Sequence, residues 1–154
     1  MITERILEEV RGRMLEDIVL LETTRALSKR YRVFKLAFRI GEFDMVIYDK
    51  DTDTCAAYEI KHSSEYAREQ ARHLMDEEKL ALTSNRYGTL IGRYVLYLGE
   101  DMDTENGIAY RNAEQFLKNL PEITLVSGLE ETVSEDENPR RSGGRRTDYY
   151  FDSL

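Results

Sequence analysis

Residues 41–63, GEFDMVIYDKDTDTCAAYEIKHS, contain the pattern that decides how this chain folds. Two runs of alternating residues, 42–48 and 55–61, flank the polar segment 49–54, which is typical of a β-hairpin. If that segment closes the turn, Tyr48 pairs with Cys55 and the apolar side chains gather on one face. A slip of one residue would turn them to the opposite face, so the hydrophobic pattern favours this register. The predicted apolar face consists of Phe43, Met45, Ile47, Ala56, Tyr58 and Ile60.

The same register places Asp44 directly opposite Glu59, with Lys61 two residues further along the same face. Opposed carboxylates with Cβ atoms about 5 Å apart repel each other and destabilise a hairpin. Mg²⁺ would remove the repulsion, because it takes oxygen ligands and is usually bound by one or two carboxylates. Lys61 is placed to orient a water or to stabilise charge on a phosphate. The alternative is an ordinary solvated face of a hairpin.

The composition is that of a polar, globular chain. Of the 154 residues, 41% are hydrophobic and 34% are charged, which predicts one domain, 1–128, followed by a polar tail, 129–154. No apolar run approaches the length of a membrane span, and the charged N-terminus is unlike a secretory signal. The single cysteine, Cys55, fits a reducing cytoplasm, which is the expected location. One cysteine and two histidines are too few for a zinc site of the usual kind.

The charge distribution sets one segment apart. The net charge of −8 argues against a general nucleic-acid-coating protein. Residues 25–39 nevertheless contain only basic charges, which is suited to holding phosphates. The alternative is that these charges keep a helix end and an edge strand soluble. The basic residues are Arg25, Lys29, Arg30, Arg32, Lys35 and Arg39.

Residues 3–29 are predicted to form a long helix with a potential break near Gly12. Two apolar groups lie on different parts of the helical wheel, so more than one side of the helix is expected to be covered. The first is a stripe of Leu7, Val10, Met14, Ile18 and Leu21, and the second consists of Val19, Leu20 and Leu27.

Glu16 belongs to the second group and is a candidate for a third site carboxylate. Gly12, one turn before it, would permit a close approach of another element. The alternative is a partly exposed glutamate paired with an arginine, and Glu22 is a rival by similar reasoning.

The remaining segments predict an alternation of strands and helices. A strand is expected over 31–40, a central strand over 89–99 and a short strand over 123–127. Ser63 is expected to cap a helix over 65–85, which would place Gln70 and His73 near Lys61 as phosphate contacts or as surface residues. Asn112 is expected to cap a short helix that ends at Pro121.

The sequence contains neither a complete calcium-binding loop nor a Walker-type phosphate loop. The acidic segment 100–107 resembles part of a calcium-binding loop but lacks its full spacing and terminal glutamate, so we interpret it as a turn. The chain has no Gly-rich phosphate loop of the Walker type, and it is not expected to bind ATP by itself.

The order α-β-β-β-α-β, with an acid on the first helix, Asp44 on the second strand and Glu59-x-Lys61 on the third, resembles the PD-(D/E)XK nuclease superfamily. Phe43 replaces the proline that often precedes the aspartate. The resemblance implies a restriction-endonuclease-like α/β fold with a mixed central sheet flanked by helices. It also implies Mg²⁺ or Mn²⁺ held by Asp44 and Glu59 with help from Glu16. Lys61 would position the attacking water, and the substrate would be a DNA phosphodiester.

A closer resemblance is to the nuclease-like C-terminal domain of bacterial and archaeal AAA-type ATPases. The segments that carry it are GRMLEDIVLLE (12–22), GEFDMVIYD (41–49) and YEIKHS (58–63). It implies an alternative function, a catalytically silent module that binds DNA or protein beside an AAA-type ATPase. Many nucleases of this fold form homodimers, so a homodimer is also among the implied assemblies. A third hypothesis is a structural domain whose acidic residues are ordinary surface residues, because fold does not determine function.

Overall fold

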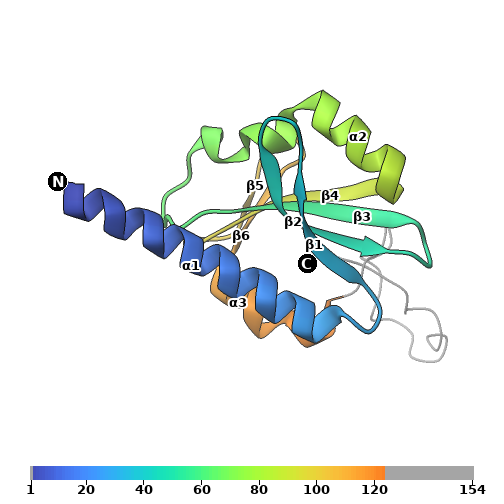
Figure 1. Cartoon of the computed structure of the whole chain (residues 1–154), viewed down its shortest axis with the longest axis horizontal. Coiled ribbons are helices and arrows are strands. Elements are labelled where there is room, and N and C mark those ends of the chain that lie inside the picture. Colours follow the sequence, from blue (N-terminus) through green and yellow to red (C-terminus); the bar gives the residue numbers. More distant parts are fainter. Residues whose placement is uncertain (1, 124–154) are drawn as a thin grey trace.

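The structure is a computed structural model that describes residues 2–123. It confirms a mixed α/β protein with a six-stranded mixed sheet flanked by helices (Figure 1). The predicted strand 123–127 and tail 129–154 lie almost entirely outside the described residues. The elements are α1 (Ile2–Leu27), β1 (Arg32–Ala37), β2 (Glu42–Asp49), β3 (Thr54–Ile60), the 3₁₀ helix η1 (Arg68–Met75), α2 (Glu77–Tyr87), β4 (Thr89–Tyr97), β5 (Met102–Asp103), β6 (Ala109–Asn112), α3 (Ala113–Lys118) and η2 (Leu120–Glu122).

The sheet has the strand order β1-β2-β3-β4-β6-β5. Strands β1, β2 and β3 form an antiparallel meander, β4 runs parallel to both β3 and β6, and β5 closes the far edge in the antiparallel sense. Strand β4 therefore lies inside the sheet, which confirms the prediction of a central strand there. Neither β5 nor β6 was predicted, because a two-residue and a four-residue strand give too little alternation to detect.

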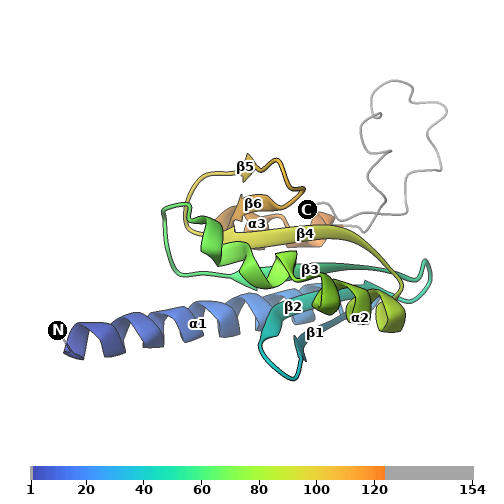
Figure 2. The same ribbon diagram turned by 90° about the horizontal axis from the view of Figure 1, so that it is seen from above.

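Two apolar cores cover the two faces of the sheet. Helices α1 and α3 pack on one face, where Val19, Tyr58 and Phe116 are buried. Helices η1 and α2 pack on the other, where Val46 and Leu74 are buried. Figures 1 and 2 show the sheet between these two layers, with the first turns of α1 extending beyond it.

The predicted hairpin register is confirmed over most of its length. Met45 pairs with Tyr58, Ile47 with Ala56 and Tyr48 with Cys55. The predicted position of Phe43 is wrong, because its side chain joins the α2-side core whereas Met45 and Ile47 join the α1-side core.

A bulge in β2 explains the position of Phe43. The pairing of β1 with β2 shifts between Phe34–Val46 and Leu36–Phe43, so Asp44 and Met45 together stand opposite the single residue Lys35. An extra residue of this kind disrupts the regular alternation of faces and re-aims the side chains beside it. The bulge falls on Asp44, one of the predicted site residues.

Helix α1 differs from its prediction in two respects. It continues without a break through Gly12, and no described atom lies within 4 Å of a Cβ added there, so this glycine serves no close approach. The predicted stripe from Leu7 to Leu21 is not covered by the rest of the chain, since each of its five side chains is 45–55% exposed. The second predicted group, Val19, Leu20 and Leu27, packs on the sheet instead.

The helix predicted over 65–85 is divided into two. Ser63 caps no helix: its hydroxyl accepts a hydrogen bond from the Glu65 N–H in a local turn. The break falls at Asp76, whose side chain accepts hydrogen bonds from the N–H groups of Glu78 and Lys79 and so begins α2. Further along, Asn112 caps α3 as predicted, accepting from the Gln115 N–H.

No helix in the described part of the chain is long and apolar enough to cross a membrane.

Candidate active site

The site is built where β2 and β3 separate. Their pairing ends at Met45–Tyr58, so Asp44 and Glu59 are not the directly paired residues that the simple register predicts. At this point a side chain replaces a backbone acceptor: Oδ2 of Asp44 accepts a hydrogen bond of 2.8 Å from the Ile60 N–H. The bulge thus turns a strand residue into a side-chain acceptor within the sheet, and Asp44 is 6% exposed.

Glu59 supplies a second and deeper carboxylate. Glu59 is 2% exposed, and its Oε1 lies 3.4 Å from Nζ of Lys61, two residues along the chain. Its other oxygen, Oε2, is buried and has no hydrogen-bond partner among the described residues. Such an atom is rare in folded proteins, because leaving a buried polar group without a partner costs about 1–3 kcal/mol.

Helix α1 adds the third predicted carboxylate. One carboxylate oxygen from each of Glu16, Glu42 and Asp44 lies within 4.8 Å of the other two. Glu22, the rival of Glu16, is exposed and instead lies 3.5 Å from Arg25 on its own helix. The structure therefore brings together Glu16 and Asp44.

Glu42 was not predicted as a site residue. It precedes Asp44 by two positions on a strand, and residues so spaced normally share a face of the sheet. That spacing was the available signal. With Glu42 the site contains four carboxyl groups from three elements, α1, β2 and β3.

Burial and mutual repulsion make these acids hard to ionise. Burial, together with the nearby charge of Asp44, raises the pKa of Glu59 to about 8. Burial also raises the pKa of Asp44, with a further contribution from Glu42, although the Ile60 hydrogen bond and Lys61 oppose the change. The pKa of Glu16 is raised by burial and by Asp44. The protein holds a cluster of acids that favours protons or cations.

Basic groups compensate only in part. Nζ of Lys35 lies 3.7 Å from Glu16 and 3.6 Å from Glu42. Although burial lowers the pKa of Lys35, Glu42 and Glu16 raise it above its ordinary value. Lys61 contacts Glu59 and remains 36% exposed, so its amine reaches both the buried acid and the solvent. The arrangement is suited to binding a divalent cation and an anion from solution together.

His73 borders the site through Gly41. This glycine has φ +87°, and a Cβ on it would lie 2.7 Å from Cε1 of His73, so the turn before β2 packs directly on the histidine ring. Burial lowers the pKa of His73, as do the charges of Lys79, Arg72 and Lys61. His73 is thus held near the acids in a setting that favours its neutral form.

Gln70 has a local structural role in the fold. Its Oε1 accepts from the Ala67 N–H, and its Nε2 donates to the Glu65 carbonyl. These bonds brace the segment that leads from Lys61 into η1. Its predicted contact with phosphate stays a prediction.

The residues of the basic segment 25–39 have different surroundings. Lys35 lies in the acid cluster, Arg30 forms a 2.9 Å ion pair with the buried Asp49, and the Arg32 guanidinium stacks over the Phe34 ring. Arg25 and Lys29 are exposed at the end of α1. Strand β1 is an edge strand, so the solubility interpretation also fits its exposed charges.

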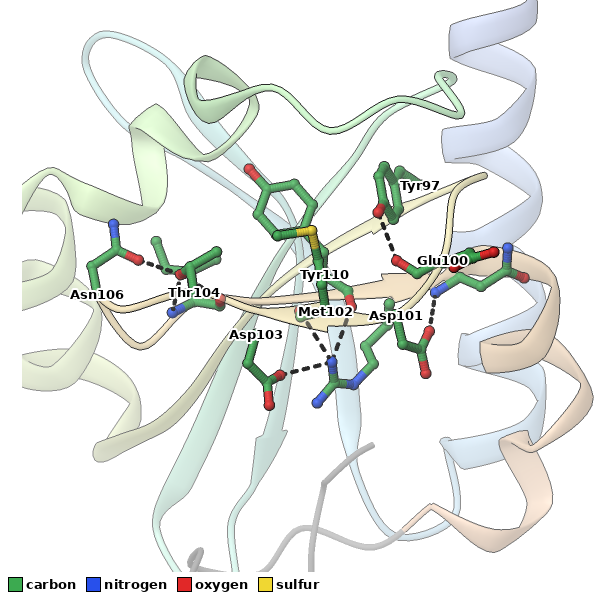
Figure 3. Close-up of polar contacts among 11 residues, drawn as sticks. Tyr97, Glu100, Asp101, Met102, Asp103, Thr104, Asn106 and Tyr110 are labelled. Atoms are coloured by element: carbon green, nitrogen blue, oxygen red, sulfur yellow. Dashed lines mark hydrogen bonds and ion pairs between the residues drawn. The ribbon is translucent and has the colours of Figure 1, made fainter.

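The acidic segment 100–107, predicted to be a turn, contains the short strand β5 (Met102–Asp103) and turns only over 105–107 (Figure 3). Asp101 accepts a hydrogen bond of 2.8 Å from the Asn112 N–H, and Asp103 lies 2.9 Å from Arg111. The Thr104 hydroxyl donates to the Ile108 carbonyl and closes the loop. Within residues 2–123, the only group of three or more acids, histidines or cysteines close enough to share a metal ion is Glu16, Glu42 and Asp44.

Comparisons of this chain with models of protein families, with curated proteins and with solved structures found no match.

Proposed function

We propose that this chain is a metal-dependent nuclease domain with a restriction-endonuclease-like fold of the PD-(D/E)XK type. The observation that carries the proposal is the buried Oε2 of Glu59, which lacks a partner within the described residues and lies beside the raised-pKa carboxyl of Asp44. A domain that only had to fold would be more stable with an amide or an apolar residue there. The element order α1, β1, β2, β3, α2 and β4 supports the fold assignment.

The donor set fits a hard divalent cation. It consists of carboxylate oxygens, which Mg²⁺ and Mn²⁺ prefer, and contains no histidine or cysteine ligand. Asp44 would hold the ion together with Glu16 and Glu42, whose carboxylate oxygens lie within 4.8 Å of its own, and Glu59 would be a further ligand from β3. When bound, such an ion supplies Lewis-acid stabilisation of a phosphoryl group and lowers the pKa of water.

The chain's own groups would act around the ion. Lys61 is tied to Glu59 at 3.4 Å, and its partly exposed amine is placed to orient a water or to stabilise negative charge on a phosphate oxygen. Lys35 would hold Glu16 and Glu42 in place. Arg25, Lys29 and Arg32, exposed on the α1 end and the β1 edge, would contact the phosphate backbone.

The proposal is tested by incubating supercoiled plasmid and single-stranded DNA with the full chain and Mg²⁺ or Mn²⁺, beside samples with EDTA. The Lys61→Ala variant is the test, and Lys50→Ala, an exposed lysine in the turn of the same hairpin, is the matched control. We expect metal-dependent cleavage that is lost in Lys61→Ala and retained in Lys50→Ala. Absence of cleavage, or equal cleavage by both variants, would contradict the proposal.

The alternative is a silent module that binds DNA or protein beside an AAA-type ATPase. It predicts salt-dependent DNA affinity that survives Lys61→Ala while neither protein cuts. Charge reversal at Lys29 and Arg32, followed by measuring the same affinity, tests whether the basic segment carries the binding.

A further inference from the structure

Helix α1 carries apolar side chains on two opposite sides. The inner side, with Val19, Thr23 and Leu27, is buried on the sheet. At 100° per residue, the outer side lies half a turn away from it. We call this outer group the outer stripe. It consists of Ile6, Leu7, Val10, Met14, Ile18 and Leu21, each 45–55% exposed.

The outer stripe is too concentrated to be ordinary surface. Single exposed apolar residues are normal, whereas contiguous patches mark interaction surfaces. The other large hydrophobic residues exposed within residues 2–123 are scattered over separate elements: Ile40 before β2, Tyr66 before η1 and Leu82 on α2. Figure 2 shows that the first turns of α1 project past the sheet, and the stripe residues on these turns are exposed.

The spacing of the outer stripe is symmetric about Met14. Leu7 and Leu21 each lie seven residues from Met14, and Val10 and Ile18 each lie four residues from it. In an antiparallel pair of α1 helices, Met14 would face Met14 of the other copy, Leu7 would face Leu21, and Val10 would face Ile18. A surface that complements itself in this way is what a two-fold interface requires.

The flanking charges favour the antiparallel orientation. Asp17 of one helix would lie opposite Arg11 of the other, and Glu4 near Arg25, each contact occurring twice by symmetry. A parallel pair would instead place Arg25 against Arg25 at the basic end of the helix. Antiparallel packing also sets the helix dipoles in opposition.

The available area is sufficient for a dimer. Six half-exposed side chains, with the charged residues beside them, would bury about 1,000 Å² in total, which is near the lower limit for specific interfaces. A second copy supplies apolar counterparts for Leu7, Val10, Met14, Ile18 and Leu21 at the same spacing, whereas Ile6 would face Glu22 at the rim.

We propose that the outer stripe is a homodimer interface, in which two copies of the chain pack their α1 helices antiparallel around a two-fold axis at Met14. The inference is independent of the nuclease proposal. Glu16 points from the inner side of α1 toward Asp44, so the pairing leaves each acid cluster outside the interface.

The first test measures mass in solution over a range of concentrations, by light scattering and sedimentation, with the full chain. The native chain is expected to be a dimer, and Met14→Glu is expected to weaken the dimer by about 100-fold, the scale of a central interface residue. Leu82→Glu on α2, where the native leucine is 47% exposed against 55% for Met14, is the matched control and should leave the dimer intact. A monomeric native chain, or a Met14→Glu variant that still dimerises, would overturn the proposal.

The second test fixes the orientation and does not depend on losing the dimer. Under oxidising conditions Met14→Cys should form a disulfide-linked dimer, whereas Leu7→Cys should do so only in combination with Leu21→Cys. The native Cys55 is buried, and burial raises its pKa to about 12, so it contributes no background. A Leu7→Cys variant that cross-links by itself would show a parallel pair and overturn the antiparallel arrangement.

Discussion

The two acidic regions of this protein differ in the burial of their carboxylates and in the partners of these carboxylates. In the loop 100–107, Asp101 receives a backbone N–H and Asp103 an arginine, and both are exposed (Figure 3). At the separation of β2 and β3, Asp44 and Glu59 are buried beside each other, and one oxygen of Glu59 lacks a partner within the described residues. The loop acids stabilise the fold, whereas the strand acids destabilise it, which is the expected signature of a functional site.

The largest expected contrast is in activity. Asp44→Asn and Glu59→Gln should each lower DNA cleavage by at least about 100-fold, because each removes a negatively charged ligand from the ion. Asp101→Asn and Asp103→Asn, in the other acidic region, should cleave at the native rate. The rates are compared with plasmid and saturating Mn²⁺. Equal losses in both pairs of variants would remove the distinction between the two regions.

The next contrast is in the sign of stability changes without metal. At pH 8, Glu59→Gln should raise the free energy of unfolding by about 1–3 kcal/mol, because it removes a buried charge. Asp49→Asn should lower it by about 2 kcal/mol. Asp49 is also fully buried, but its carboxylate accepts from Arg30 at 2.9 Å and from the Asp51 N–H at 3.0 Å. Urea unfolding measures both. A loss of stability in Glu59→Gln would contradict our description of Glu59.

A third contrast concerns pH. The folded protein holds the Glu59 proton up to about pH 8, whereas a free glutamate releases it near 4.5, so this group stabilises the fold fully below pH 4.5. Its contribution is lost as pH rises to about 8, by a few kcal/mol at about 1.4 kcal/mol per pKa unit. The raised pKa values of Asp44 and Glu16 act in the same direction, whereas the lowered pKa of His73 opposes them below pH 6.5, the ordinary pKa of histidine.

The pH dependence is measured by thermal unfolding of the metal-free protein, with Glu59→Gln as the reference. We expect the native curve to fall more steeply than the variant curve between pH 4.5 and 8. Parallel curves would show that Glu59 ionises as an ordinary surface glutamate. Added Mg²⁺ should stabilise the native protein more at higher pH, because ligation requires ionised carboxylates.

The smallest effect is expected in the loop. Asp103 is 76% exposed, so the ion pair with Arg111 should contribute no more than about 1 kcal/mol. Asp103→Asn should therefore change the urea midpoint only slightly, and less at high salt. A larger loss would mean that the loop acids carry more of the fold than their exposure indicates.

The sequence predicted most of the architecture because alternation marks β1, β2 and β3, and an apolar run with weak alternation marks the central strand β4. It also predicted that the carboxylates of Glu16 and Asp44 would belong to one site, because helical periodicity placed Glu16 on the buried side of α1 and strand periodicity placed Asp44 on the polar face of the hairpin. The errors have physical causes. The bulge at Asp44 and Met45 moved Phe43 to the other face, and the side chain of Asp76 divided one expected helix in two.

Burial could be predicted only in part. A stripe such as Leu7 to Leu21 on α1 has the same spacing whether it packs on its own domain or on a second molecule, so the helical wheel could not assign the partner. Glu42 was missed because a charged residue at a strand start is most often a surface residue. The raised pKa of Glu59 and the lack of a hydrogen-bond partner for its Oε2 among the described residues could not be predicted from the sequence, because both depend on which groups surround the carboxyl in three dimensions.

The most direct test of the central claim is a calorimetric titration of Mn²⁺ into the native protein, Asp44→Asn and Asp103→Asn at pH 7.5. We predict saturable binding to the native protein and to Asp103→Asn, and binding at least about 10-fold weaker in Asp44→Asn. Absence of binding to the native protein, or equal affinity in Asp44→Asn, would contradict the assignment of the strand acids as a metal site.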